Sequence, residues 1–188
     1  MKRYLEPYLS ISDESLRVFM DSSSAKQQAA KTIIFRPGRA NRHLLFLEKG
    51  LLRAYRLVEG QEYTHYFLVE GWFATDFQSF LTDQASKLYL ESLTPVTYLE
   101  FEKTVLLQLY QEHHELERLG RVIAEQAYLK TVERLIDFQT LTLKNRYAKL
   151  IGQHPHLFQQ VPQKMIASYL GVAEQSLSRI KANWSNNS

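Results

Sequence analysis

The stretch QKMIASYLGVAEQSLSRI, residues 163–180, has the spacing of two short helices that cross around a tight turn. Gly171 ends the first helix, because glycine adopts the positive φ of a helix C-terminus without strain. Ala167 is small at the point where the second helix must pass over the first. Apolar residues supply the buried contacts on both helices: Ile166, Leu170, Val172, Leu177, Ile180 and, one turn later, Trp184. The stretch predicts a helix-turn-helix.

The second helix of this motif carries a polar face beside its apolar stripe. Such a helix reads base edges in the major groove of double-stranded DNA, while neighbouring side chains hold phosphates. By the usual pairings we expect Arg179 on guanine, Gln175 on adenine and Glu174 on the amino group of cytosine. Phosphate contacts are expected from Ser176, Ser178 and Lys181. Any one of these residues could instead be an ordinary solvated residue. Ala173 stands where a Ser or Thr would cap the helix.

Charge is concentrated around this motif. Residues 140–188 hold six Lys and Arg and one acid, a formal charge of +5 within a chain of +3, so the first 139 residues sum to −2. A basic segment on a folded domain is an electrostatic footprint for polyanions. The basic charge therefore supports the same prediction as the motif, namely binding to DNA.

Composition excludes several classes of protein. Hydrophobic residues make up 45% and charged residues 23%, as in a packed globular chain, which excludes a disordered one. There is no cysteine, which excludes disulfide scaffolds, thiolate zinc sites, Cys-ligated iron–sulfur clusters and cysteine nucleophiles. No apolar run suggests a membrane span and no export signal opens the chain. We expect a cytoplasmic protein that does not act at a membrane.

The N-terminal part reads as β structure between helices. Residues 5–30 read as short helices and loop. From Lys31 to Phe101, short runs of β-branched and aromatic residues alternate with glycines, and two of them flank a Glu59-Gly60 hairpin tip. Residues 76–81, DFQSFL, interrupt them with a helical turn, and the strand predicted over 89–101 breaks near Pro95. The pattern predicts a small barrel or sandwich.

A long helix is predicted over residues 115–143, and its apolar residues change face part-way along. The first face holds Leu116, Leu119, Ile123 and Ala127; the second holds Tyr128, Val132, Leu135, Ile136 and Leu143. One face can pack on the β domain, and the other on the same helix of a second subunit, since a two-fold axis makes such a surface self-complementary. The alternative is a helix buried all round in a monomer. A short helix over 144–154 and a loop over 154–162 complete the prediction.

With a β-barrel-like domain, a long helix and this C-terminal motif, the chain resembles the Crp/Fnr family of bacterial transcription regulators, in particular its short Bacteroidetes-type members. The resemblance is strongest in IASYLGVAEQSLSRI, residues 166–180, and in EGWFATDFQSFL, residues 70–81. It implies an α+β fold: a double-stranded, jelly-roll-like β-roll sensor domain over 1–112, a dimerisation helix over 113–143 and a helix-turn-helix domain over 144–188. It also implies a homodimer on double-stranded DNA that acts through RNA polymerase and catalyses nothing.

The resemblance places an effector pocket in the second segment. Members that bind cyclic AMP carry a Gly-Glu pair and, further on, an Arg-Ser/Thr pair; here these positions are Thr75-Asp76 and Ser86-Lys87, with Phe77 beside them. A buried phosphodiester needs a charge-assisted donor, and Lys87 offers a point charge without the bidentate fork of arginine. We therefore expect no cyclic nucleotide or other cofactor, and another small molecule or none in the pocket. A cyclic-nucleotide-dependent activator stays open as the alternative.

A metal enzyme on a cupin-like barrel is the remaining alternative. It would need clustered histidines and a glutamate, and the β region offers only His43 and His65. The pairs His113-His114 and His154-Pro155-His156 do not have the spacing of metal ligands on a helix face. We expect no metal site.

Overall fold

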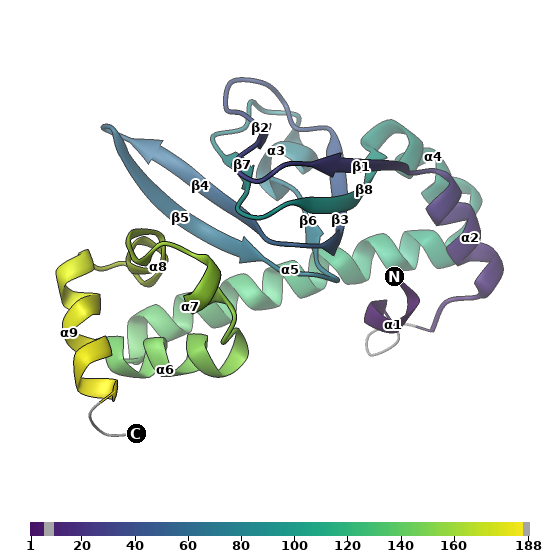
Figure 1. The fold of residues 1–188 in the computed structure, drawn as a ribbon. Coiled ribbons are helices and arrows are strands. Elements are labelled where there is room, and N and C mark those ends of the chain that lie inside the picture. Colours follow the sequence, from purple (N-terminus) through teal and green to yellow (C-terminus); the bar gives the residue numbers. More distant parts are fainter. Residues whose placement is uncertain (6–9, 186–188) are drawn as a thin grey trace. The chain divides into compact units, whose positions relative to one another are not determined.

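The computed structural model describes residues 1–5 and 10–185, apart from the side chains of 183–185, and Figure 1 labels its helices and strands. The chain forms two compact units. The first, here called the β-roll unit, comprises Met1–Ala54 and Phe67–Leu129; the second, the helical unit, comprises Tyr55–Tyr66 and Lys130–Ser188. The β4–β5 hairpin and helix α5 each contribute residues to both units.

The described residues form two four-stranded sheets, as expected for a jelly-roll-like β-roll. One sheet has the order β1 (Ser24–Gln28), β8 (Val96–Glu102), β3 (His43–Lys49) and β6 (Phe73–Ala74). The other has the order β2 (Ile33–Phe35), β7 (Tyr89–Ser92), β4 (Leu52–Val58) and β5 (Gln61–Leu68). Sheet neighbours are often far apart in sequence, so the roll is held by long-range antiparallel pairing, as between β1 and β8.

The predicted hairpin is confirmed. Glu59 and Gly60 join β4 to β5, and both have positive φ, 51° and 79°. Two successive residues of positive φ are typical of the type I′ turn, whose twist matches that of the flanking strands. The helical turn predicted over 76–81 is also present, as α3 (Phe77–Thr82).

Helices close the core of the β-roll unit. These are α1 (Lys2–Leu5), α2 (Asp13–Asp21), α4 (Lys103–Glu112) and the first half of α5 (His114–Thr140). The rings of Phe19 and Phe101 stack with centroids 4.2 Å apart, and Leu116 and Leu119 have no exposed surface. Of the first apolar face predicted for the long helix, Leu116, Leu119 and Ile123 are thus buried, as expected, and Ala127 is half-buried.

The helical unit contains the second half of α5, followed by α6 (Leu143–Gln153), α7 (Leu157–Gln160), α8 (Gln163–Leu170) and α9 (Glu174–Ser185). The second predicted face of α5 is open to solvent in the single chain, with Leu135 and Ile136 each at least half exposed. In the described part of the chain, no helix is long and apolar enough to cross a membrane.

Three sequence-based expectations about elements were wrong. Residues 24–28, expected within a region of short helices and loop, form β1, because pairing with β8 holds a polar segment that has no apolar alternation of its own. The loop expected over 154–162 contains α7, whose Leu157 is buried. The long helix stops at Thr140, and Leu143 begins α6 behind the Thr142 cap instead of extending the apolar face.

Candidate DNA-binding surface and effector segment

The turn between α8 and α9 has the geometry that the sequence predicts. Gly171 lies in the left-handed region, φ 71° and ψ 35°, and the amide of Val172 donates to the carbonyl of Ala167 at 3.0 Å. This six-to-one hydrogen bond ends α8 as in a Schellman motif. The apolar anchors Ile166, Ala167, Leu170 and Leu177 are buried, while Val172 and Ile180 are half-buried. Trp184 lies outside the residues whose side chains are described.

Two residues from outside the motif hold this turn from behind. The ring of Phe138 on α5 covers Gly171. Arg146 on α6 donates to the carbonyl of Leu141 at 2.9 Å and to that of Leu170 at 3.3 Å, and its guanidinium lies 4.8 Å from the centre of the Phe138 ring. Carbonyls at helix C-termini lack intrahelical donors, so Arg146 satisfies acceptors that would otherwise stay open.

The six residues proposed from the sequence for DNA contact lie on α9. Glu174, Gln175, Ser178 and Arg179 are exposed, and Ser176 and Lys181 are half-buried. The structure therefore presents a polar face whose first turn carries Glu174 and Gln175, with Arg179 one turn further on. Ala173 has no side-chain oxygen that could accept a first-turn amide of α9, and its backbone carbonyl accepts the amides of Ser176 and Leu177.

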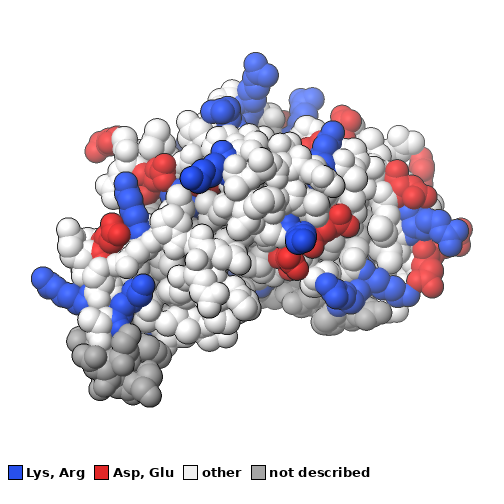
Figure 2. All heavy atoms as spheres, viewed as in Figure 1, with Lys and Arg blue, Asp and Glu red and all other residues white. Residues whose placement is uncertain are grey.

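Basic side chains project from the surface that α9 forms (Figure 2). A helix that enters the groove of DNA is helped by cations at its flanks, because phosphate contacts supply a large share of the binding free energy. The Nε2 of Gln163, at the start of α8, donates to the hydroxyl of Ser178 and lies 3.5 Å from the carbonyl oxygen of Glu174. Gln163 was missed by the sequence reasoning, since its place beside α9 depends on the crossing of the two helices.

The residues expected to line an effector pocket lie between positions 75 and 87, here called the effector segment. Within it, Asp76 and Ser86 are buried and hydrogen-bonded to each other. The Ser86 hydroxyl donates to one carboxylate oxygen of Asp76 at 2.7 Å. The other oxygen accepts the amide of Ser79 at 3.3 Å, so Asp76 is the N-cap of α3. The two positions that the resemblance implied as a pocket are thus brought together, and both carboxylate oxygens accept from donors of the chain itself.

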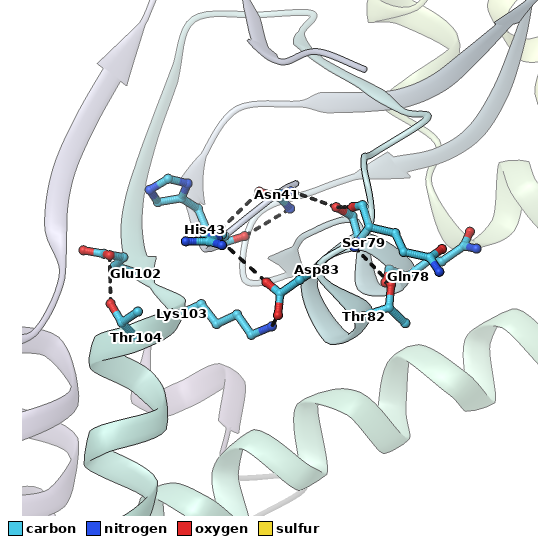
Figure 3. Close-up of polar contacts among 11 residues, drawn as sticks. Asn41, His43, Gln78, Ser79, Thr82, Asp83, Glu102, Lys103 and Thr104 are labelled. Carbon is cyan, nitrogen blue, oxygen red and sulfur yellow. Dashed lines mark hydrogen bonds and ion pairs between the residues drawn. The ribbon is translucent and has the colours of Figure 1, made fainter. Parts of the chain in front are cut away.

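Thr75 belongs to the same network. Its hydroxyl donates to the carbonyl of His43 at 2.9 Å and accepts the side-chain amide of Asn41 at 2.8 Å. Figure 3 shows Asn41 beside Ser79, whose hydroxyl accepts the backbone amide of Asn41 at 2.8 Å and donates to the carbonyl of Gln84 at 2.6 Å. The start of α3 is therefore fixed to β3 and to its own following loop by side-chain hydrogen bonds.

The cations around this segment lie at its edge. Lys87 is exposed and Phe77 half-buried. At the C-cap of α3, Asp83 accepts Lys103 at 2.9 Å and lies 3.8 Å from Arg42, as Figure 3 shows for Lys103. Lys103 and Arg42 hold the pKa of the Asp83 carboxyl below its usual value, the hydrogen bond from Lys103 being the main cause. Lys103 and Arg42 are therefore paired with Asp83, an acid of the chain itself.

Among the described residues, histidine and acid side chains do not converge on a metal site. Within residues 1–5 and 10–182, no group of three or more His, Asp or Glu is placed to hold an ion. His43 and His65 lie on β3 and β5, in different sheets. The cupin-like alternative has no support in this part of the chain.

Comparisons with known proteins agree with this architecture. Residues 25–113 match the model of the cyclic nucleotide-binding domain. No curated protein sequence matches the chain significantly.

Solved structures resemble the chain along most of its length. FixK2 from Bradyrhizobium japonicum has a TM-score of 0.74 at 12% identity, over 88% of this chain and 85% of its own. A putative Crp/Fnr family transcriptional regulator from Eubacterium rectale has a TM-score of 0.72 at 15% identity, over 98% and 88%. The c-di-GMP responsive regulator CLP from Xanthomonas campestris has a TM-score of 0.70 at 17% identity, over 94% and 93%. Residues 25–113 thus resemble cyclic nucleotide-binding domains, and the chain as a whole has the same fold as these solved structures of Crp/Fnr-type proteins.

Proposed function

We propose that this chain is a sequence-specific, DNA-binding transcription regulator of the Crp/Fnr type, and that it is not an enzyme. The observation that carries the proposal is the α8–Gly171–α9 motif, whose apolar side is buried and whose polar side is exposed. The basic excess of residues 140–188 supports the same partner, since DNA is a polyanion.

In this proposal α9 enters the major groove. Arg179 pairs bidentately with guanine, Gln175 with adenine, and Glu174 accepts from cytosine. Ser176, Ser178 and Lys181 contact phosphates and set the register. Arg179 has the largest share in specificity, because a bidentate arginine–guanine pair discriminates by about 1–3 kcal/mol.

The regulator is proposed to be a homodimer in the cytoplasm that acts through RNA polymerase. The exposed stripe of α5 supports the dimer: Tyr128 is 68% exposed, and Leu135 and Ile136 lie further along the same helix. A helix that offers such side chains to water is suited to the same helix of a second copy, since a two-fold axis makes the contact isologous. Half-sites about one turn of DNA apart would then match the two α9 helices.

The signal is proposed to be a molecule other than a cyclic nucleotide, or none. The buried Asp76 carboxylate, already bonded to Ser86 and to the amide of Ser79, would repel a phosphodiester, and no arginine stands at the phosphate position. The family match of residues 25–113 favours the alternative of a cyclic-nucleotide-dependent activator. Calorimetry with cyclic AMP and cyclic GMP separates the two, because saturable heat in the micromolar range would overturn the first.

DNA binding is tested by selecting binding sites from random duplexes and measuring affinities by anisotropy at fixed salt. Arg179→Ala should weaken the selected site about 10- to 100-fold and relax the preference at one position. Arg17→Ala, which removes an exposed arginine of α2, is the matched control and should change neither. Selection of no site, or unchanged affinity and preference in Arg179→Ala, would contradict the proposal.

A further inference from the structure

Strand β5 ends its sheet, and its free edge is held by helical residues. In the order β2-β7-β4-β5, β5 lies at the end of its sheet and pairs, among the described strands, with β4 alone. The backbone groups on the other side of an edge strand need hydrogen-bond partners from outside the sheet. Along the hairpin tip, the groups of this edge belong to Glu62 and Thr64, alternate residues as the pleat requires.

Ser168, in the first helix of the helix-turn-helix, bonds both residues. Its hydroxyl accepts the Thr64 amide at 2.8 Å and donates to the Glu62 carbonyl at 2.9 Å. One oxygen thus serves as donor and acceptor, as a neighbouring strand would. A carboxylate could only accept and an ammonium could only donate, so the contact requires a group that both donates and accepts, as the hydroxyl does.

Arg134 on α5 continues the same edge. Its guanidinium donates to the carbonyl of Tyr169 at 2.9 Å and lies 3.5 Å from the Thr64 carbonyl oxygen. The rings of Tyr169 and Tyr66 lie 4.1 Å and 5.6 Å from it. Burial lowers the pKa of Arg134 against the opposing influence of the two tyrosines. One cation therefore joins α5, the end of α8 and the hairpin tip.

We propose that Ser168 and Arg134 are positioning residues for DNA binding: they fasten the helix-turn-helix to the free edge of β5, so that α9 meets DNA as one rigid body with the hairpin tip. We call this set of contacts the edge latch. Its effect on DNA rests on the proposed function; its existence does not. Because both residues hold backbone groups of β5, a shift of that strand along its own axis would break both contacts together.

The route into the β-roll unit follows from chain connectivity. β5 leaves the helical unit at Tyr66, and its next residue, Phe67, is buried in the other unit. After β6 the same chain reaches Asp76 and α3. A change at the effector segment thus has a short covalent path to the edge that Ser168 holds.

The latch is tested first without DNA, by amide exchange measured by NMR on the full chain. Ser168→Ala should speed the exchange of the Thr64 amide at least tenfold, whereas Ser168→Thr keeps the hydroxyl and should protect it. Arg134→Lys is the second variant, with Gln139→Ala as a control on an exposed position of α5. Unchanged exchange at Thr64 in Ser168→Ala would overturn the latch itself.

Affinity for a selected DNA site is then measured beside affinity for random duplex. A freed helix-turn-helix must be ordered on binding, so Ser168→Ala and Arg134→Lys should weaken the selected site on the order of tenfold and leave random duplex unchanged. Faster exchange at Thr64 with full affinity and discrimination would overturn the positioning role. If the wild-type protein selected no site, the proposed function and this role would both fail, while the exchange rates would still report the latch.

Discussion

The ring of Phe138 lies so close over Gly171 that a β-carbon on the glycine would stand 2.7 Å from a ring carbon. Two separate features of the structure therefore require glycine at position 171. Its φ of 71° is a conformation that side chains oppose, and its missing side chain makes room for the Phe138 ring of α5. The turn of the helix-turn-helix and the end of α5 are thus built as one packing unit.

Gly171→Ala should destabilise the helical unit by about 2–4 kcal/mol, from the left-handed strain and the overpacking against Phe138 together. Urea unfolding followed by circular dichroism measures it. Gly152→Ala is the matched control, because a β-carbon there meets nothing within 4 Å and α6 gains roughly 0.5–1 kcal/mol from alanine. Equal effects of the two substitutions would contradict the account of the turn.

Ile136→Glu should separate the proposed dimer into folded monomers. Ile136 is 50% exposed, so the change costs the single chain little, whereas a charge in a two-fold contact is buried twice. Sedimentation velocity gives the oligomeric state and circular dichroism the fold. Leu107→Glu, on the 49% exposed Leu107 of α4, is the control and should have the same oligomeric state as the wild type. A wild-type protein that sediments as a monomer at micromolar concentration would contradict the dimer.

Ser86→Ala should lower the free energy of unfolding of the β-roll unit by about 1–3 kcal/mol. The substitution leaves the buried Asp76 carboxylate without the hydroxyl that now donates to it. Lys87→Ala changes the exposed neighbour and should be neutral within about 0.5 kcal/mol. A neutral Ser86→Ala would show that solvent or another donor serves Asp76.

Elements whose contacts lie close together in the sequence could be predicted from it, and elements that depend on distant residues could not. The motif around Gly171 was predicted because its helices, its turn and its buried side chains lie within eighteen residues. Strand β1 was missed because its polar side chains carry no signal, and only β8, some seventy residues later, makes it a strand. Ser168 was missed for the same reason, since nothing near it in the chain marks its bond to Thr64, 104 residues before it. Asp76 and Ser86 were predicted as residues of the effector segment, but the hydrogen bond between them was not predicted.

His154, at the end of α6, should make stability depend on pH near neutrality. Burial lowers the pKa of its imidazole in the folded chain, and the nearby Lys130 adds to the effect. The unfolded chain therefore binds the proton more readily, so the free energy of unfolding should fall as pH drops through the unfolded value of about 6.5 toward the lower folded value. The carboxyls of Asp13, Asp83 and Glu115 have lowered pKa values and titrate below this window.

Urea unfolding at pH 8 and pH 5.5 measures the change in the free energy of unfolding, and His154→Gln should reduce that change relative to the wild type. His156→Gln, on an exposed histidine two residues away, should keep it. The same loss of stability at pH 5.5 in His154→Gln as in the wild type would assign the effect to another group.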